Sequence, residues 1–282
     1  MLDITAILED WEQFLYTVLG APEKYEMAMA LHAMMMGESP EAIMERYPSA
    51  RALREDPDGA AMASLSRTDL ATVSDEDLIA AQDMINHHYG FFLSVEDLVV
   101  FMRELLTRIN ISEVRTVADI GCGPCSYTSF LLSRGLLRAK VKAVDPSLAI
   151  LMRARVVSEE ADTSDSIELI EGWGQYLPVE DSFSDLTLMI DSLEWMSKWQ
   201  EALCEAARVT SEGGRLFICH STFSPRRRID EMKIVKVLSR EGMDVKDILH
   251  FGAGASATPR ILVIATKQEP QGVIVPTDTI DY

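Results

Sequence analysis

The chain has 282 residues, 48% of them hydrophobic, and a formal net charge of −19. This length allows one large or two small domains with a sizeable core, and the negative field excludes nucleic acid and anionic membrane surfaces as partners. Four cysteines are too few for a disulfide framework, the N-terminus is acidic rather than a basic targeting signal, and no apolar run reaches transmembrane length. These features predict a soluble, reduced, cytoplasmic protein.

Residues 1–110 are predicted to be helical throughout. Apolar residues recur at helical spacing over 2–19, and Ser39, Ser74 and Ser94 stand where helix N-caps are expected. Ten of the 15 methionines lie in residues 1–114, together with 21 Asp/Glu against 7 Lys/Arg. Because methionine adapts to irregular apolar partners, this region is predicted to be a lid over a hydrophobic substrate or a homodimer contact. Packing between the helices is the structural alternative for most of these methionines.

Residues 111–268 have a different texture, in which short β-rich runs alternate with helical stretches. The runs are RTVADI at 115–120, VKAVD at 141–145, SIELIEG at 166–172, SDLTLMID at 184–191, GGRLFICHS at 213–221, VKDILHF at 245–251 and RILVIATK at 260–267. This alternation predicts βαβ units and a mainly parallel sheet of an α/β domain. Residues 269–282 are predicted to be a loop-like tail.

A glycine-rich turn follows the first of these strands, in the sequence VADIGCGPC. Gly121 and Gly123 allow the backbone to turn tightly and approach a ligand closely, and the helix that follows offers free N–H groups. About 20 residues later, Asp145 ends the second strand, where an acid can accept hydrogen bonds from both ribose hydroxyls. The two features together predict a ligand that contains a nucleoside.

The segment 167–219 carries a further series of motifs, which point to a particular protein family. It contains Gly172, Leu177-Pro178, Asp181-Ser182-Phe183, Asp185, Ala202-Leu203, Glu205, Arg208-Val209 and Gly213-Gly214. These residues, in this order after D-x-G-x-G at 119–123, resemble the class I S-adenosylmethionine (SAM) methyltransferase family over roughly 115–267. The resemblance implies a Rossmann-like fold with a seven-stranded, mostly parallel sheet flanked by helices, preceded here by an all-helical lid or subdomain.

The resemblance also implies roles for single residues. Asp119 and the turn of Gly121, Cys122 and Gly123 would hold the methionine end of SAM. Asp145, followed by Pro146, would hold the ribose. The turn of Gly172, Trp173 and Gly174 would border the adenine, and Asp191 would face the methyl-transfer pocket. The chain departs from the family pattern at Cys125, which replaces a third glycine, and at Trp173, which replaces the acid that contacts adenine and could stack on the ring instead.

Cys122-Gly123-Pro124-Cys125 also matches the signature of a thioredoxin redox centre. That interpretation is disfavoured because Gly121 stands where thioredoxin-like proteins have a tryptophan, and because the surrounding motifs explain Gly123 without redox chemistry. Cys204 and Cys219 lack the paired spacing of a zinc site, so no metal is predicted.

Three residues are candidates for a general base, which methyl transfer needs only if the nucleophile arrives protonated. His220 follows the fifth strand and is expected near the active face. His88 and Tyr89 precede the domain in a segment that, in this family, often covers the cofactor. A structural role is the alternative for each histidine.

The predicted activity is methyl transfer to O, or to N or S, of a small molecule or peptide. The alternatives are a SAM fold with non-methylating chemistry and a non-catalytic SAM-binding partner subunit.

Overall fold

A computed structural model describes residues 3–19, 30, 40–48, 73–80, 83, 95–221, 229–251 and 260–268. The strands are β1 (Thr116–Ile120), β2 (Lys140–Asp145), β3 (Ile167–Glu171), β4 (Ser184–Ile190), β5 (Thr210–Ser221), β6 (Met243–Phe251) and β7 (Arg260–Lys267). They form one seven-stranded sheet in the order β3-β2-β1-β4-β5-β7-β6, in which β7 runs antiparallel to both its neighbours. The predicted Rossmann-like fold is confirmed, and all seven predicted runs are strands.

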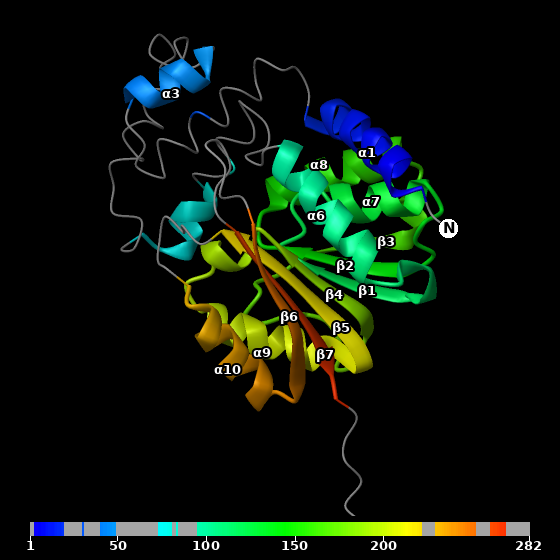
Figure 1. The fold of residues 1–282 in the computed structure, drawn as a ribbon, viewed down its shortest axis with the longest axis vertical. Coiled ribbons are helices and arrows are strands. Elements are labelled where there is room, and N and C mark those ends of the chain that lie inside the picture. The colour runs from blue at the N-terminus through cyan, green and yellow to red at the C-terminus, as the bar shows by residue number, and fades with distance from the viewer. Residues whose placement is uncertain are drawn as a thin grey trace, which may run out of the picture.

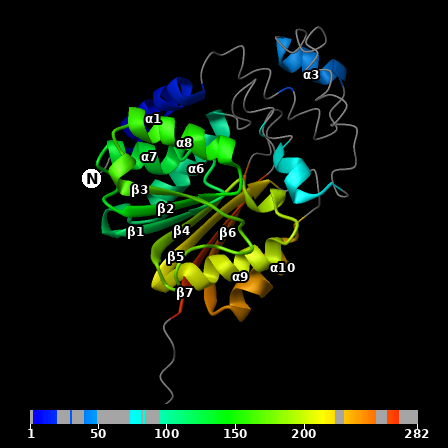
Figure 2. The same ribbon diagram turned by 180° about the vertical axis from the view of Figure 1, so that it is seen from behind.

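Helices cover both faces of this sheet (Figures 1 and 2). The helices labelled in Figure 1 are α1 (Ile4–Leu19), α3 (Pro40–Arg46), α6 (Val95–Arg108), α7 (Ser126–Ser133), α8 (Leu148–Glu160), α9 (Trp199–Val209) and α10 (Glu231–Arg240), of which α3 lies away from the sheet. Short 3-10 turns are η2 (Ile111–Glu113), η3 (Ser164–Ser166) and η4 (Leu193–Trp195). One face carries α1, α6, α7 and α8, and the other carries α9 and α10. Within the described residues, every helix is too short or too polar to span a lipid bilayer.

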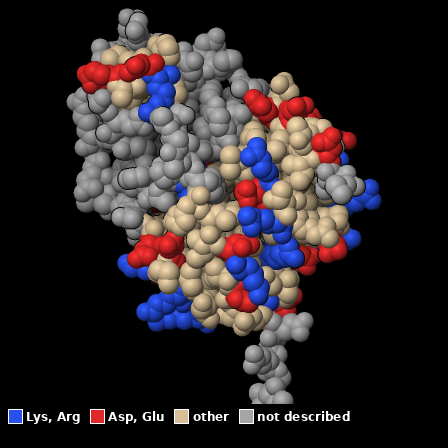
Figure 3. All heavy atoms as spheres, in the orientation of Figure 1, with Lys and Arg blue, Asp and Glu red and all other residues tan. Residues whose placement is uncertain are grey.

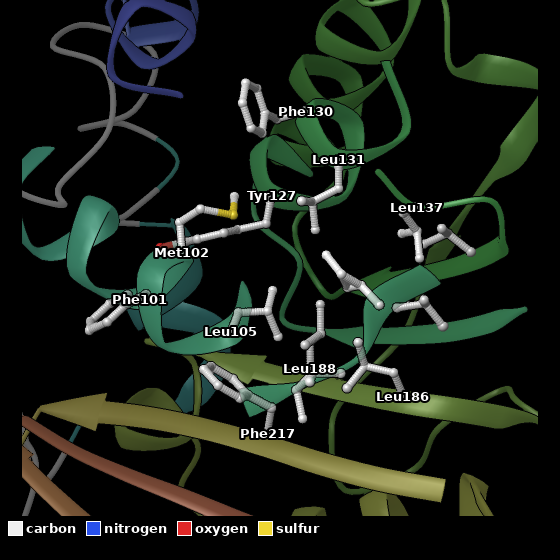
Figure 4. Close-up of a cluster of buried hydrophobic side chains, with 14 of the residues drawn as sticks. Phe101, Met102, Leu105, Tyr127, Phe130, Leu131, Leu137, Leu186, Leu188 and Phe217 are labelled. Atoms are coloured by element: carbon white, nitrogen blue, oxygen red, sulfur yellow. The ribbon is translucent and has the colours of Figure 1, made fainter. Parts of the chain in front are cut away.

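The core is split into two clusters, one on each face of the sheet. Since side chains alternate along a strand, neighbouring residues of β5 enter different clusters: Phe217 and Cys219 pack under α6 and α7, whereas Leu216 and Ile218 pack under α9 and α10. Figure 4 shows Phe217 beneath α6. This alternation tells which face each functional side chain belongs to.

The first helix is fastened to the α/β domain by aromatic packing. Trp11 is fully buried, with its ring centroid 5.0 Å from that of Tyr127 and 4.9 Å from that of Phe130, both on α7. Phe14 lies 5.5 Å from Phe130. Aromatic pairs at such separations add to the free energy gained from burial. The described part of α1 therefore packs against α7, the helix that begins directly after the glycine turn.

Acidic and basic side chains are interspersed over the described surface in the view of Figure 3. An example is Arg108 on α6, which pairs with Glu104 at 2.7 Å and with Asp247 of β6 at 3.2 Å. Such half-exposed pairs contribute little to stability individually.

Candidate cofactor and acceptor site

The predicted cofactor residues gather at the carboxyl edge of the sheet, around the end of β1. This strand pairs with β2 on one side and with β4 on the other, both parallel, so the chain winds in opposite directions from it. Ligands of open α/β sheets bind at such a switch in strand order. Asp119 lies near the end of β1, Asp145 ends β2, and Asp191 directly follows β4. Because these strands are parallel, the three acids lie at the same edge of the sheet.

The glycine turn is held tightly against its neighbours. Gly121 has a φ of +67°, a backbone conformation that glycine adopts readily and that residues with a Cβ atom disfavour. A Cβ atom at this position would lie 2.4 Å from the Cβ of Ser192. The backbone N–H groups of Gly121 and Cys122 both donate to the carbonyl of Val144, at 2.8 and 3.1 Å. The turn is thus fastened to β2 on one side and to the end of β4 on the other.

Asp145 is hydrogen-bonded to this turn. Its carboxylate accepts the N–H of Gly123 at 3.1 Å and the N–H of Ser147 at 3.0 Å. Burial raises the pKa of Asp145 to about 6, against the lowering effect of these two hydrogen bonds. Pro146, between Asp145 and Ser147, is partly exposed.

Asp119 is more deeply buried, with 6% of its surface exposed. The hydroxyl of Thr128 donates to it at 3.3 Å. Burial raises the pKa of Asp119 to about 7, and the nearby Asp145 carboxylate raises it further. In the part of the chain that the structure describes, neither carboxylate contacts a lysine or arginine. Two acids enclosed in this way favour a ligand with a cationic group and hydroxyl donors.

The second predicted turn lies beside Asp145. Gly172 donates its N–H to the Asp145 carbonyl at 3.2 Å, and a Cβ at Gly172 would lie 2.8 Å from Pro178. Gly174 has a similar constraint, since its Cβ would lie 2.7 Å from the sulfur of Met196. Trp173 is half-buried and forms an isolated bridge with Tyr176. These glycines allow close packing of the turn, and the contact of Trp173 with adenine stays a prediction.

The CGPC stretch directly precedes α7, and Cys125 is the N-cap of that helix. Its two cysteines are free thiols, joined by a backbone hydrogen bond from Cys125 N to Cys122 O of 3.0 Å. Burial raises the pKa of the Cys122 thiol well above its usual value, and the pKa of Cys125 is also raised. Reactive cysteines have lowered pKa values instead. Cys125 adopts a φ of +55°, in the left-handed region that favours glycine, and its small side chain is fully buried.

Replacing both Cys122 and Cys125 by serine is expected to leave cofactor binding nearly unchanged, because the thiols are protonated and the turn is held by backbone contacts. Calorimetric titration with S-adenosylhomocysteine would measure this, with the loss expected to be below about 1 kcal/mol. A folded double variant that binds the cofactor but has lost all turnover would restore the thiol interpretation.

Several residues of the family pattern have structural roles. The Asp185 carboxylate accepts the N–H groups of Arg115 and Thr116, at 2.8 and 3.1 Å, and so fastens the start of β1 to β4. Arg208 donates to Glu205 and to the carbonyls of Leu177 and Val179. These bonds fix the loop that follows the second glycine turn, so the motif stabilises the site without lining it.

His220 is fully buried. His220 is two residues after Ile218 on β5 and is paired in register with Ile261 of β7. Both isoleucines belong to the core cluster under α9 and α10. The His220 side chain therefore projects from the face that packs on α9 and α10. Its role as a base stays a prediction. His88 and Tyr89 lie outside the described residues.

Sequence reasoning missed the partner of Asp191. The Asp191 carboxylate forms an ion pair with Arg260, the first residue of β7, and the two side chains are 4% and 3% exposed. Asp191 itself has a φ of +49°, and its N–H donates to the Cys219 carbonyl at 2.7 Å. Nothing in the run RILVIATK distinguishes Arg260 from an ordinary charged residue at a strand end, because its ion pair is formed with a residue 69 positions away in the chain.

Two acids of the N-terminal region also reach this edge, and the sequence had not marked them as site residues. Asp83 is hydrogen-bonded to the hydroxyl of Ser147, the N-cap of α8. Asp75 accepts a 2.6 Å hydrogen bond from Ser197, just before α9. Ser147 follows β2 and Ser197 follows β4, so these contacts lie on either side of β1.

Comparison with known proteins agrees with this geometry. The family described as "Methyltransferase domain" matches residues 118–218. A trans-aconitate 2-methyltransferase of Azoarcus sp. (strain BH72) is 29% identical over 116 residues, 41% of this chain and 43% of that protein. The chain spans about half or less of the length of the curated relatives it matches.

Two solved structures share the fold. A SAM-dependent methyltransferase from Aquifex aeolicus is 20% identical with a TM-score of 0.50, covering 59% of this chain and 89% of its own. The cyclase SpnF is 15% identical with a TM-score of 0.54, covering 62% and 84%. The family match places a methyltransferase domain over residues 118–218, and the sheet order and these two likenesses show that this domain has the Rossmann-like fold of class I SAM-dependent methyltransferases.

Proposed function

We propose that this protein is a SAM-dependent methyltransferase that transfers a methyl group to an oxygen, or to a nitrogen or sulfur, of a small-molecule or peptide acceptor. The observation that carries the proposal is the pair of enclosed carboxylates, Asp119 and Asp145, on either side of the Gly121–Gly123 turn. SAM would supply an activated methyl group on a sulfonium. Its ammonium group and ribose hydroxyls are the cation and the donors that two such acids would accept.

In this proposal the protein acts chiefly by alignment. Asp119 would accept the ammonium of the methionine end, and Asp145 the ribose hydroxyls. Gly121 would let the backbone approach the cofactor without a side chain in between. Holding the nucleophile and the methyl group in line can supply much of the reduction in the barrier.

The N-terminal region would serve as a lid. The support is that Asp75 and Asp83 contact Ser197 and Ser147 on the two sides of β1, so described parts of this region lie beside the cofactor turn. Hydrogen bonds between a carboxylate and a hydroxyl stabilise by only about 1–3 kcal/mol, which permits opening for ligand exchange. A homodimer contact remains the alternative role for the other N-terminal helices.

The affinity for S-adenosylhomocysteine is expected to increase with pH. Asp119, with a pKa of about 7 in the ligand-free protein, is largely protonated at pH 5.5, and an ammonium binds its ionised form. Between about pH 5.5 and 7.5 the association constant should therefore increase by roughly twentyfold and then level off. Calorimetry across this range measures the effect.

The matched control is Asp119→Asn, which should bind more weakly and with a flatter pH dependence. The ligand-free wild type should lose stability as the pH increases from about 4 to about 7, because the raised pKa of Asp119 favours folding only while the acid is protonated. An affinity that does not change over this range would remove Asp119 from the ammonium site.

The activity itself is tested by incubating the protein with SAM and candidate acceptors, and by looking for a mass gain of one CH₂ in the acceptor. Non-methylating chemistry is the second candidate, because a cyclase shares this fold. SAM binding with a changed acceptor of unchanged mass would favour it. SAM binding with no change in any acceptor would favour a non-catalytic partner subunit.

A further inference from the structure

The Asp191–Arg260 pair is a buried ionic group at the carboxyl edge of the sheet. Burying two charges costs several kcal/mol each before their attraction is counted, and a replacement by apolar residues is often more stable. Among the described residues, Arg260 is the only buried arginine or lysine. Its guanidinium carbon lies 5.1 Å from the ring centroid of Phe101 on α6, which is itself 1% exposed.

The pair lies at the carboxyl edge, on the side of β1 opposite Asp145. Arg260 reaches this edge because β7 is antiparallel to β5 and begins there, paired in register with Ser221. Asp191 is followed by Ser192, whose hydroxyl donates to the Ile120 carbonyl at 2.9 Å and whose Cβ faces Gly121. Asp191 is therefore one residue away from the contact between Ser192 and the glycine turn. Arg260 lies at the start of β7, beside the end of β5.

This placement divides the edge into two halves. Asp145 and the second glycine turn belong to the β2 and β3 half, where the nucleoside of the cofactor is proposed to lie. The β4, β5 and β7 half is left for the acceptor. Its buried cation is Arg260, which projects on the α6 face, since its neighbours at alternate positions, Leu262 and Ile264, pack there.

Resting on the proposed function, we propose that Arg260 anchors the carboxylate of an acidic acceptor, which is methylated on oxygen. A guanidinium has five N–H donors in a fork that matches a carboxylate, so it can bind Asp191 and a second carboxylate together. Asp191 balances the charge of Arg260 when the acceptor is absent and sets the orientation of its side chain. With the acceptor bound, the sulfonium of the cofactor supplies the second positive charge.

The step balances without a base. A carboxylate is already ionised at neutral pH, so the lone pair of its free oxygen attacks the methyl carbon while the other oxygen is held by Arg260. The C–O bond forms as the C–S bond breaks, and the electron pair of that bond goes to sulfur. The products are a neutral methyl ester and a thioether, and no proton moves. This agrees with the position of His220, which projects from the opposite face of the sheet.

The test compares carboxylic acids with their primary amides, for example benzoate with benzamide and succinate with succinamide. Methyl-labelled SAM measures transfer, and alkaline release of labelled methanol identifies a methyl ester. Binding is measured independently, as the shift in melting temperature that each compound causes in the protein saturated with S-adenosylhomocysteine. The variants are Arg260→Lys and the double variant Asp191→Asn with Arg260→Met, which avoids leaving one charge buried alone. Arg215→Met, at the other end of the same β5–β7 ladder, is the matched control.

The expected result is that acids, not amides, are methylated and raise the melting temperature. Arg260→Lys should lower kcat/KM about tenfold or more, and the double variant about a hundredfold or more. Arg260→Lys should bind S-adenosylhomocysteine within about threefold of wild type, and Arg215→Met should match wild type throughout.

Two results would overturn the inference while leaving the proposed function intact. One is acids and amides behaving alike with the wild type. The other is S-adenosylhomocysteine binding that falls more than about tenfold in Arg260→Lys, because Arg260 would then belong to the cofactor site. Failure of the wild type to bind S-adenosylhomocysteine would instead refute the proposed function, and the acceptor assignment with it.

Discussion

Replacing Gly121 by alanine is expected to lower the free energy of unfolding by about 2–5 kcal/mol. An alanine at a φ of +67° costs about 1–2 kcal/mol for its backbone alone. Its Cβ would also be placed 2.4 Å from that of Ser192, and forcing apart packed groups costs about 1–3 kcal/mol more. Denaturant unfolding monitored by circular dichroism measures the change.

Gly135→Ala separates the two effects. Gly135 has a similar φ of +64°, but no atom lies within 4 Å of the position a Cβ would take. This control should lose only the backbone cost, about 1–2 kcal/mol. Adding Ser192→Gly to Gly121→Ala should recover the part of the loss that comes from the clash. Equal losses in Gly121→Ala and Gly135→Ala would show that Ser192 moves aside at no cost.

Asp145→Ala is expected to weaken S-adenosylhomocysteine binding by about 1.5–3 kcal/mol, which is roughly 10- to 150-fold in the dissociation constant. The variant removes the acceptor for the ribose hydroxyls and also the bond to Gly123 that shapes the turn. The ligand-free protein should lose little stability at neutral pH, since the raised pKa of Asp145 shows that its charge is unfavourable there.

Glu171→Ala is the matched control for Asp145. Glu171 ends β3, is paired in register with Asp145 and is exposed, so its loss should leave the affinity unchanged. Calorimetry that gives the same affinity for wild type and Asp145→Ala would remove Asp145 from the cofactor site.

The sequence by itself determined the strands and the glycine turn, because both depend on local patterns. The apolar runs predicted all seven strands, since a strand buried on both faces is continuous and β-branched. Gly121, Gly123 and Asp145 could be identified because a tight turn needs glycine and because strand ends of a parallel sheet share one edge. The family resemblance added the order of motifs, though it did not distinguish residues proposed to bind the cofactor, such as Asp145, from those that fasten a loop, such as Arg208.

Only the tertiary structure decided which side chains meet across the edge. The antiparallel insertion of β7 between β5 and β6 brings Arg260 to Asp191, and no periodicity in the sequence encodes that order of strands. The same is true of Asp83 beside Ser147. The face from which His220 projects depends on the register of β5, where a shift of one residue would reverse it. Contacts between distant segments arise from how the whole sheet packs, so they are settled by the assembled fold rather than by any local pattern.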